Sequence, residues 1–151
     1  MEISVEQAVG NNARWCEIVC RAHGRPGEFF DEIWINRAPL PRYYPNAQTL
    51  AKRGSRRIEL IKELVHEPLP AGWAVKDSFA SLDLAGCGFS PLFDAQWIYL
   101  SDERLETIRP TAAPDLQWQI VHDDGLLAEW EDAWCAAQRD TNRARVFLPA
   151  L

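Results

Sequence analysis

The spacing of apolar residues along the chain alternates between the period of a helix and the period of a strand. Between Ser4 and Gly24, five apolar residues lie close to helical spacing, interrupted at residues 10–12: Val5, Val9, Trp15, Val19 and Ala22. A serine before such a run and a glycine after it are typical of helix termini. The pattern therefore predicts one long helix or one broken helix.

Two strand-like segments follow. The first, "EFFDEIWINR" at residues 28–37, is aromatic and β-branched, and the second is "NAQTLA" at residues 46–51. The proline-rich stretch "APLPRYYP" lies between them and turns the chain. These residues predict two strands joined by an irregular connection.

An amphipathic helix is predicted for residues 56–67. Its apolar residues recur at i, i+3, i+6 and i+7, with charged residues at most other positions: Ile58, Ile61, Leu64 and Val65. Pro68 ends the pattern because proline cannot continue a helix. We expect Ile58, Ile61 and Leu64 to pack into the core.

The next segments alternate again. "GWAVKD" at residues 72–77 predicts a short strand, and "SFASLDLAGCG" at 78–88 fits a short helix with a glycine exit. "FSPLFDAQWIYL" at 89–100 predicts a long strand. Residues 1–100 would thus form one α+β core, with a mixed, mostly antiparallel sheet flanked by helices.

The chain changes character beyond Leu100. Residues 101–115 are polar and contain prolines, which indicates a connector over the surface. In the tail, residues 116–151, "LQWQIVH" predicts a strand, and a helix follows that Asp123 or Asp124 can cap. The helix has a strongly apolar face: Leu126, Leu127, Trp130, Ala133 and Trp134. We expect this tail to complete the domain or to form an interface.

Composition narrows the class of protein. The 151 residues are 47% apolar and include seven tryptophans, which suffices for the core of a single domain. A formal charge of −6 argues against general affinity for nucleic acid or for anionic membranes. The N-terminus lacks the features of a signal peptide, so we expect a cytoplasmic protein whose four cysteines are reduced.

One basic turn has the layout of a phosphate-binding loop. Lys52, Arg53, Gly54 and Ser55 separate a predicted strand from a predicted helix, where backbone N–H groups can bind a phosphate. Such a loop normally carries two or three glycines, and here there is one. A solvated basic turn is therefore the competing interpretation, although these four residues are the candidate cofactor-binding residues of the chain.

A second group of residues suits metal or thiol chemistry. Cys16, Cys20 and His23 recur at i, i+4 and i+7, so they share one helical face, and thiolate with imidazole is a zinc-binding combination. No second ligand pair has the required spacing, and buried cysteine behaves as a small apolar residue. Core packing is the preferred interpretation, and we predict no metal site.

Several segments resemble GNAT-type N-acetyltransferases. The strand, short helix, Gly88-Phe89 and long strand of residues 72–100 are similar to the second half of that family's core. "NNARWCEIVCRAHG", "YYPN", "WAVKDSF" and "LDL" resemble a bacterial branch in which a degenerate GNAT-like unit precedes a second one. The resemblance covers most of residues 10–100. "LQWQIVHDDGLLAEWEDAW" is similar to the start of the second unit, which would make this chain the front part of a larger architecture.

The resemblance implies acetyl-CoA as cofactor, held by a turn of the pattern Arg/Gln-x-x-Gly-x-Gly/Ala. This chain has "KRGS" there, without the second small residue, and Leu84 stands where the family often has a tyrosine acid. Four carboxylates are candidate bases, and none is preferred: Asp31, Glu32, Asp77 and Asp94.

Two function classes therefore remain for the chain. We prefer a non-catalytic, degenerate GNAT-like module that binds a small molecule, a protein partner or its own copy. An acyl-CoA-dependent N-acetyltransferase with an irregular coenzyme site is the alternative. A homodimer through residues 116–151 is expected, because a sheet edge and an apolar helix face both favour a partner.

Overall fold

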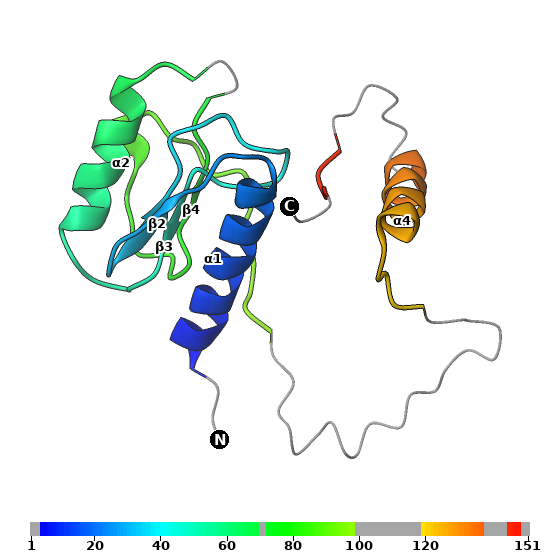
Figure 1. Ribbon diagram of the computed structural model, residues 1–151. Coiled ribbons are helices and arrows are strands. Elements are labelled where there is room, and N and C mark those ends of the chain that lie inside the picture. The colour runs from blue at the N-terminus through cyan, green and yellow to red at the C-terminus, as the bar shows by residue number, and fades with distance from the viewer. Residues whose placement is uncertain (1–3, 70–71, 99–118, 138–144, 149–151) are drawn as a thin grey trace.

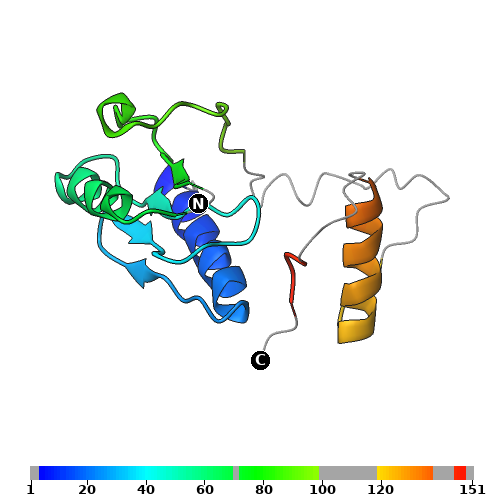
Figure 2. The same cartoon turned by 90° about the horizontal axis from the view of Figure 1, so that it is seen from above.

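The computed structural model describes residues 4–69, 72–98, 119–137 and 145–148. Over these residues the chain is α+β, and a four-stranded mixed sheet lies between two helices (Figures 1 and 2). The helices are α1 (Val5–Ala22), α2 (Arg56–His66) and α4 (Asp124–Ala137), with a short 3₁₀ helix η1 (Ala85–Cys87). The strands are β1 (Glu28–Phe29), β2 (Ile33–Ile35), β3 (Ala47–Thr49) and β4 (Val75–Lys76).

Helix α1 is one unbroken helix with the termini that the sequence predicted. The Ser4 side chain accepts a hydrogen bond from the Gln7 backbone N–H, and the Gln7 side chain accepts one from the Ser4 backbone N–H. This capping box satisfies two N–H groups that the helix itself cannot pair. Gly24, at a φ of 70°, ends the segment in the left-handed region.

The sheet follows the order β1-β2-β3-β4. β1 and β2 are antiparallel, as are β2 and β3, whereas β3 and β4 are parallel and are connected through α2. The single strand predicted over residues 28–37 is wrong, because the chain turns at Asp31 and Glu32. The Phe30 N–H donates to the Ile33 carbonyl at 2.9 Å and closes this turn, so one apolar run supplies both arms of a hairpin.

Helix α2 covers one face of the sheet, as predicted, with a different set of core residues. Ile61 and Leu64 are buried against Ile33 and Ile35, while Ile58 is partly exposed and Leu60 takes the core position instead. The buried residues of α2 follow the helical series i, i+3, i+4 and i+7: Arg57, Leu60, Ile61 and Leu64. The apolar pattern did not reveal this series because its first member is an arginine.

Helix α1 covers the opposite face of the sheet. Trp34 of β2 is completely buried there among Ala13, Cys16 and Cys20. Its indole N–H donates to the buried Glu17 carboxylate at 3.1 Å. Gln48 of β3 donates to the Val9 carbonyl at 3.2 Å, so polar bonds as well as apolar contacts fix α1 on the sheet.

Residues 89–98 do not form the predicted long strand. They have no regular secondary structure, and Leu92, Phe93 and Ile98 are between 79% and 89% exposed. Strand-forming residues need a neighbouring edge for their backbone groups. Among the described residues β4 pairs with β3 alone, so residues 89–98 do not extend the sheet.

The tail helix is confirmed, and Asp123 caps it by accepting a hydrogen bond from the Leu126 N–H at 2.8 Å. The strand predicted for residues 116–122 is absent from 119–122, and residues 116–118 lie outside the described residues. The predicted connector at 101–115 also lies outside them. Each helix in the described part of the chain is too short or too polar to span a lipid bilayer.

Aromatic side chains connect the tail to the rest of the protein. Phe147 contacts Trp15 of α1 and both Trp130 and Trp134 of α4, with ring centroids 5.2 to 6.2 Å apart. The Val146 backbone is held on both sides, because its N–H donates to Glu131 at 2.7 Å and its carbonyl accepts from His23 at 2.8 Å. Residues 145–148 thus lie between α1 and α4, as Figure 2 shows.

Candidate functional site

The basic turn lies where the sequence placed it, between β3 and the first residue of α2. Lys52, Arg53, Gly54 and Ser55 are all exposed, and Ser55 precedes the helix without a capping bond from its side chain. The strand, turn and helix layout of a phosphate loop is therefore present. Coenzyme binding by these four residues remains a prediction.

Glu32 occupies the space next to the glycine of this turn. Gly54 has a φ of 127°, a region that only glycine adopts readily, and a Cβ there would overlap the Glu32 carboxylate. The Oε2 atom of Glu32 is buried without a hydrogen-bond partner among the described residues. A carboxylate acceptor thus already lies against the turn that a phosphate would approach, which disfavours a second anion there.

Substituting alanine for Gly54 is expected to destabilise the protein by about 1–3 kcal/mol, because it combines an unfavourable φ with the overlap on Glu32. Thermal unfolding of Gly54→Ala measures the loss. In a Glu32→Ala background the same substitution should cost less, because the overlap is removed and the backbone strain is retained. Equal costs in both backgrounds would show that Glu32 does not contact the turn.

The two arginines at the start of α2 point in different directions. Arg57 is buried, and its guanidinium donates to the Ala51 and Gly54 carbonyls and to the Ser81 hydroxyl. It joins the start of α2 to the turn that follows β4. Arg56 is exposed, and its guanidinium lies 4.9 Å from the centroid of the Phe30 ring. Arg56 therefore remains available to a ligand, whereas Arg57 is committed to the fold.

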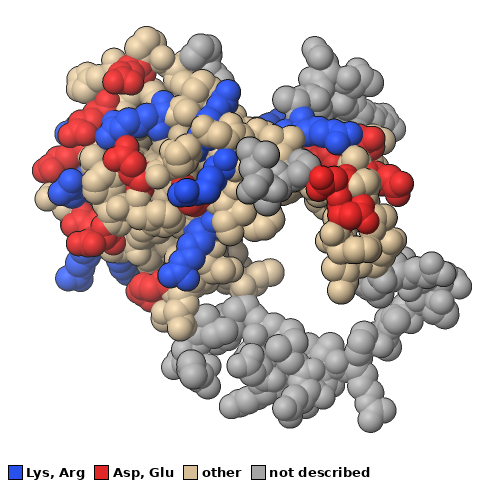
Figure 3. Space-filling model, in the orientation of Figure 1, with Lys and Arg blue, Asp and Glu red and all other residues tan. Residues whose placement is uncertain are grey.

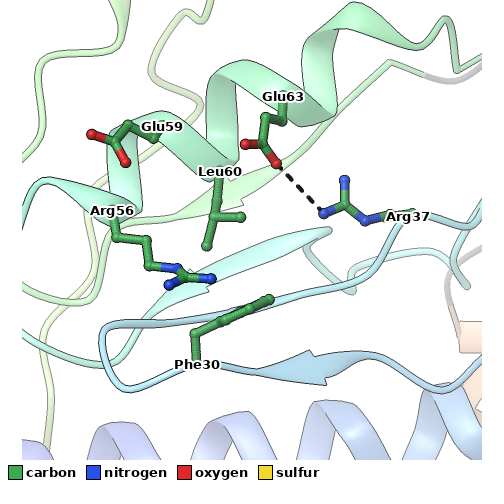
Figure 4. Close-up of a pocket in the computed structure, with 6 residues that line it drawn as sticks. All are labelled: Phe30, Arg37, Arg56, Glu59, Leu60 and Glu63. Carbon is green, nitrogen blue, oxygen red and sulfur yellow. Dashed lines mark ion pairs between the residues drawn. The ribbon is translucent and has the colours of Figure 1, made fainter.

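Beside the basic turn, the β1–β2 hairpin and α2 enclose a pocket of about 280 Å³ (Figure 4). We call it the hairpin–helix pocket, and six residues line it: Phe30, Arg37, Arg56, Glu59, Leu60 and Glu63. Phe30 and Leu60 supply its apolar surface, and charged side chains surround them. Two of the six lining residues are apolar and four are charged, so this pocket is more polar than most small-molecule sites.

The charges of the hairpin–helix pocket are unequally paired. At one end, Arg37 lies 3.4 Å from Glu28 and 3.8 Å from Glu63, in ion pairs that are substantially exposed. At the other end, Arg56 makes no ion pair within the described ranges. Exposed pairs contribute little stability, so Arg37 can exchange its partners at small cost. Arg56 provides the unpaired positive charge of the pocket.

The candidate bases do not assemble into a catalytic group. Asp77 accepts four hydrogen bonds, from the Thr49 hydroxyl and from three backbone N–H groups of residues 79–82. This carboxylate organises the turn after β4. Asp31 and Asp94 are exposed, and Glu32 lies against Gly54.

Cys16 and Cys20 are core residues, in agreement with the preferred interpretation. The Cys16 thiol donates to the Gln48 side-chain oxygen at 3.9 Å, and burial raises its pKa. Burial, together with Cys16 and Glu17 nearby, raises the pKa of the Cys20 thiol to about 12. His23 donates to the Val146 carbonyl. Both thiols are therefore protonated at neutral pH, which disfavours metal binding and nucleophilic attack.

The charged surface agrees with a local site. Basic and acidic side chains are interspersed over the face shown in Figure 3, and acidic residues gather on α4. In the described part of α4 the acidic residues are Asp124, Glu129, Glu131 and Asp132, and the helix contains no lysine or arginine. No broad basic surface suited to nucleic acid is visible on this face.

The sequence identified the turn and missed the pocket. The sequence pattern did not single out five of the residues that line the pocket: Phe30, Arg37, Glu59, Leu60 and Glu63. Comparison of the chain with models of protein families, with curated proteins and with solved structures found no match.

Proposed function

We propose that this chain is a non-catalytic, degenerate GNAT-like module that binds a small molecule in the hairpin–helix pocket. The α+β core supports this proposal, since a helix with a basic first turn follows a central antiparallel strand pair. The GNAT-like likeness itself rests on the sequence segments quoted above. The absence of a second glycine in the turn and the leucine at position 84 favour binding over acyl transfer.

The contact between Glu32 and Gly54 carries the non-catalytic part of the proposal. A coenzyme turn uses its glycines to let backbone N–H groups approach a pyrophosphate. In this chain the glycine instead leaves room for the protein's own carboxylate. A pyrophosphate placed at the same turn would meet that negative charge at short range.

We predict that coenzyme phosphates add nothing to binding. Calorimetric titration with acetyl-CoA and with S-acetylpantetheine, which lacks the phosphates, should give equal affinities or no binding for both. Incubation with acetyl-CoA and common amines should release no thiol above background, because the described residues place neither a base nor an acid to assist the reaction. Amine-dependent thiol release that falls in a Lys52→Ala/Arg53→Ala variant would support the N-acetyltransferase alternative.

The tail supports a proposal about assembly. We propose that residues 116–151 mediate homodimerisation in the cytoplasm. Trp15 and Trp130, which both contact Phe147, are 48% and 44% exposed, so this aromatic group presents apolar surface to a second copy. Sedimentation of the full chain beside one that ends at residue 115 measures the contribution of the tail to the apparent mass.

A further inference from the structure

We infer that the ligand of the hairpin–helix pocket is a small apolar monocarboxylate, anchored by the Arg56 guanidinium. This inference rests on the proposed function and adds the chemical class of the ligand. It follows from three properties of the pocket, namely an unpaired guanidinium, an apolar surface beside it and a balanced total charge.

The position of Arg56 suits a carboxylate. Its guanidinium lies over the Phe30 ring at 4.9 Å, and stacking of this kind leaves the N–H groups at the edge of the guanidinium free to donate. A carboxylate accepts two parallel hydrogen bonds from that edge, the strongest pairing available to arginine. Because Arg56 has no ion pair among the described residues, a ligand need not displace a protein carboxylate.

The apolar surface lies next to this anchor. In Figure 4 the Arg56 guanidinium lies between Leu60, on α2, and the ring of Phe30, on the hairpin. Leu60 is 5% exposed and belongs to the core, so its position is fixed by the packing of α2. A flat or branched hydrocarbon group attached to the carboxylate would lie mainly against the partly exposed Phe30 ring and exclude water from it, beside the buried Leu60.

The net charge of the pocket lining favours a ligand with one negative charge over a ligand with two. The pocket is lined by two arginines and two glutamates, whose formal charges cancel. A monocarboxylate pairs with Arg56 alone, whereas a phosphate dianion would bring a second negative charge near Glu59 and Glu63. The volume of about 280 Å³ lies just below the range of roughly 300–1,000 Å³ usual for ligand sites, so a compact ligand fits better than a coenzyme.

Titration of the ¹⁵N-labelled full chain with three matched compounds tests the inference. 3-Phenylpropionate should cause saturable shifts of residues around the pocket, and the neutral 3-phenylpropionamide should bind roughly tenfold more weakly, because it lacks the charge that strengthens the arginine bond. 2-Phenylethyl phosphate, a dianion near pH 7.5, should also bind more weakly. Equal binding of the acid and the amide, stronger binding of the phosphate, or no saturable shift with the acid would overturn the inference.

Two variants of Arg56 test whether its guanidinium anchors the ligand carboxylate, and a third variant serves as the control. Arg56→Gln should abolish the preference for the acid over the amide, and Arg56→Lys should keep part of it, because lysine retains the charge without the planar fork. Lys62→Gln removes a positive charge from the exposed side of α2, outside the pocket lining, and should bind as the parent does. If Lys62→Gln loses the preference as fully as Arg56→Gln, general charge attraction is responsible and the inference is wrong.

The test of the ligand class can fail independently of the test of the proposed non-catalytic function. Turnover of acetyl-CoA would refute the non-catalytic role and leave the carboxylate preference of the pocket to be judged by these titrations. An inactive chain without affinity for 3-phenylpropionate would refute the ligand class alone.

Discussion

Ile61→Asp is expected to leave the protein largely unfolded at room temperature. Ile61 is completely buried between α2 and the sheet. Truncating such a side chain costs about 2–5 kcal/mol, and burying an unpaired carboxylate adds several more. Their sum approaches the roughly 5–15 kcal/mol that stabilises an ordinary domain. Circular dichroism with urea and thermal unfolding measures the effect.

The same substitution three residues earlier provides the control. Ile58 belongs to the same helix and is partly exposed, so Ile58→Asp lets the carboxylate reach water and should cost a fraction of the loss. Helix propensity changes equally in the two variants because the residue types are the same. An unchanged melting temperature for Ile61→Asp would remove α2 from the core.

Trp34→Ala is expected to cost about 3–5 kcal/mol, the usual loss for a large aromatic core residue. Trp34 is completely buried between the sheet and α1, and its removal leaves a cavity. The Glu17 carboxylate would lose the indole donor and keep its bonds to Arg21 and the Gly27 N–H. Urea unfolding monitored by circular dichroism measures the change.

Two further tryptophan variants separate the contribution of the indole hydrogen bond from that of ring packing, and a buried position from an exposed one. Trp34→Phe retains most of the ring volume and removes the bond to Glu17, so it should cost about 1–3 kcal/mol. Trp15→Ala changes a tryptophan of α1 that is 48% exposed and should cost less than Trp34→Ala. Similar losses for Trp15→Ala and Trp34→Ala would contradict the central position of Trp34.

Local sequence signals were sufficient to predict where the helices lie. Ser4 marked one helix start and the pair Asp123 and Asp124 marked another, because a capping side chain acts within three residues of its own position. The apolar period located α2, whose burial follows from helix geometry. The mixed sheet with helices on its faces was also predictable, since strand-like and helical segments alternate along the chain.

The sequence did not reveal features that depend on contacts between distant residues. The role of Gly54 is set by Glu32, and a sequence pattern cannot show which side chain lies over a turn. The hairpin–helix pocket joins Phe30 and Arg37 to Arg56 and Glu63 of α2 through contacts that exist only in the folded chain. Strand propensity failed at residues 89–98 for a related reason, because propensity alone does not show whether a segment pairs with the open edge of β4.

The strand order of the sheet has a consequence for how the chain is made. Each strand pairs with the strand that precedes it in sequence, so a nascent chain leaving the ribosome always presents the edge that the next strand requires. Helix α1 is synthesised before the strands that it packs on, since its contacts with Trp34 and Gln48 come from β2 and β3. Helix α1 therefore remains undocked until β2 and β3 have emerged, and its apolar face is exposed to chaperones during that interval.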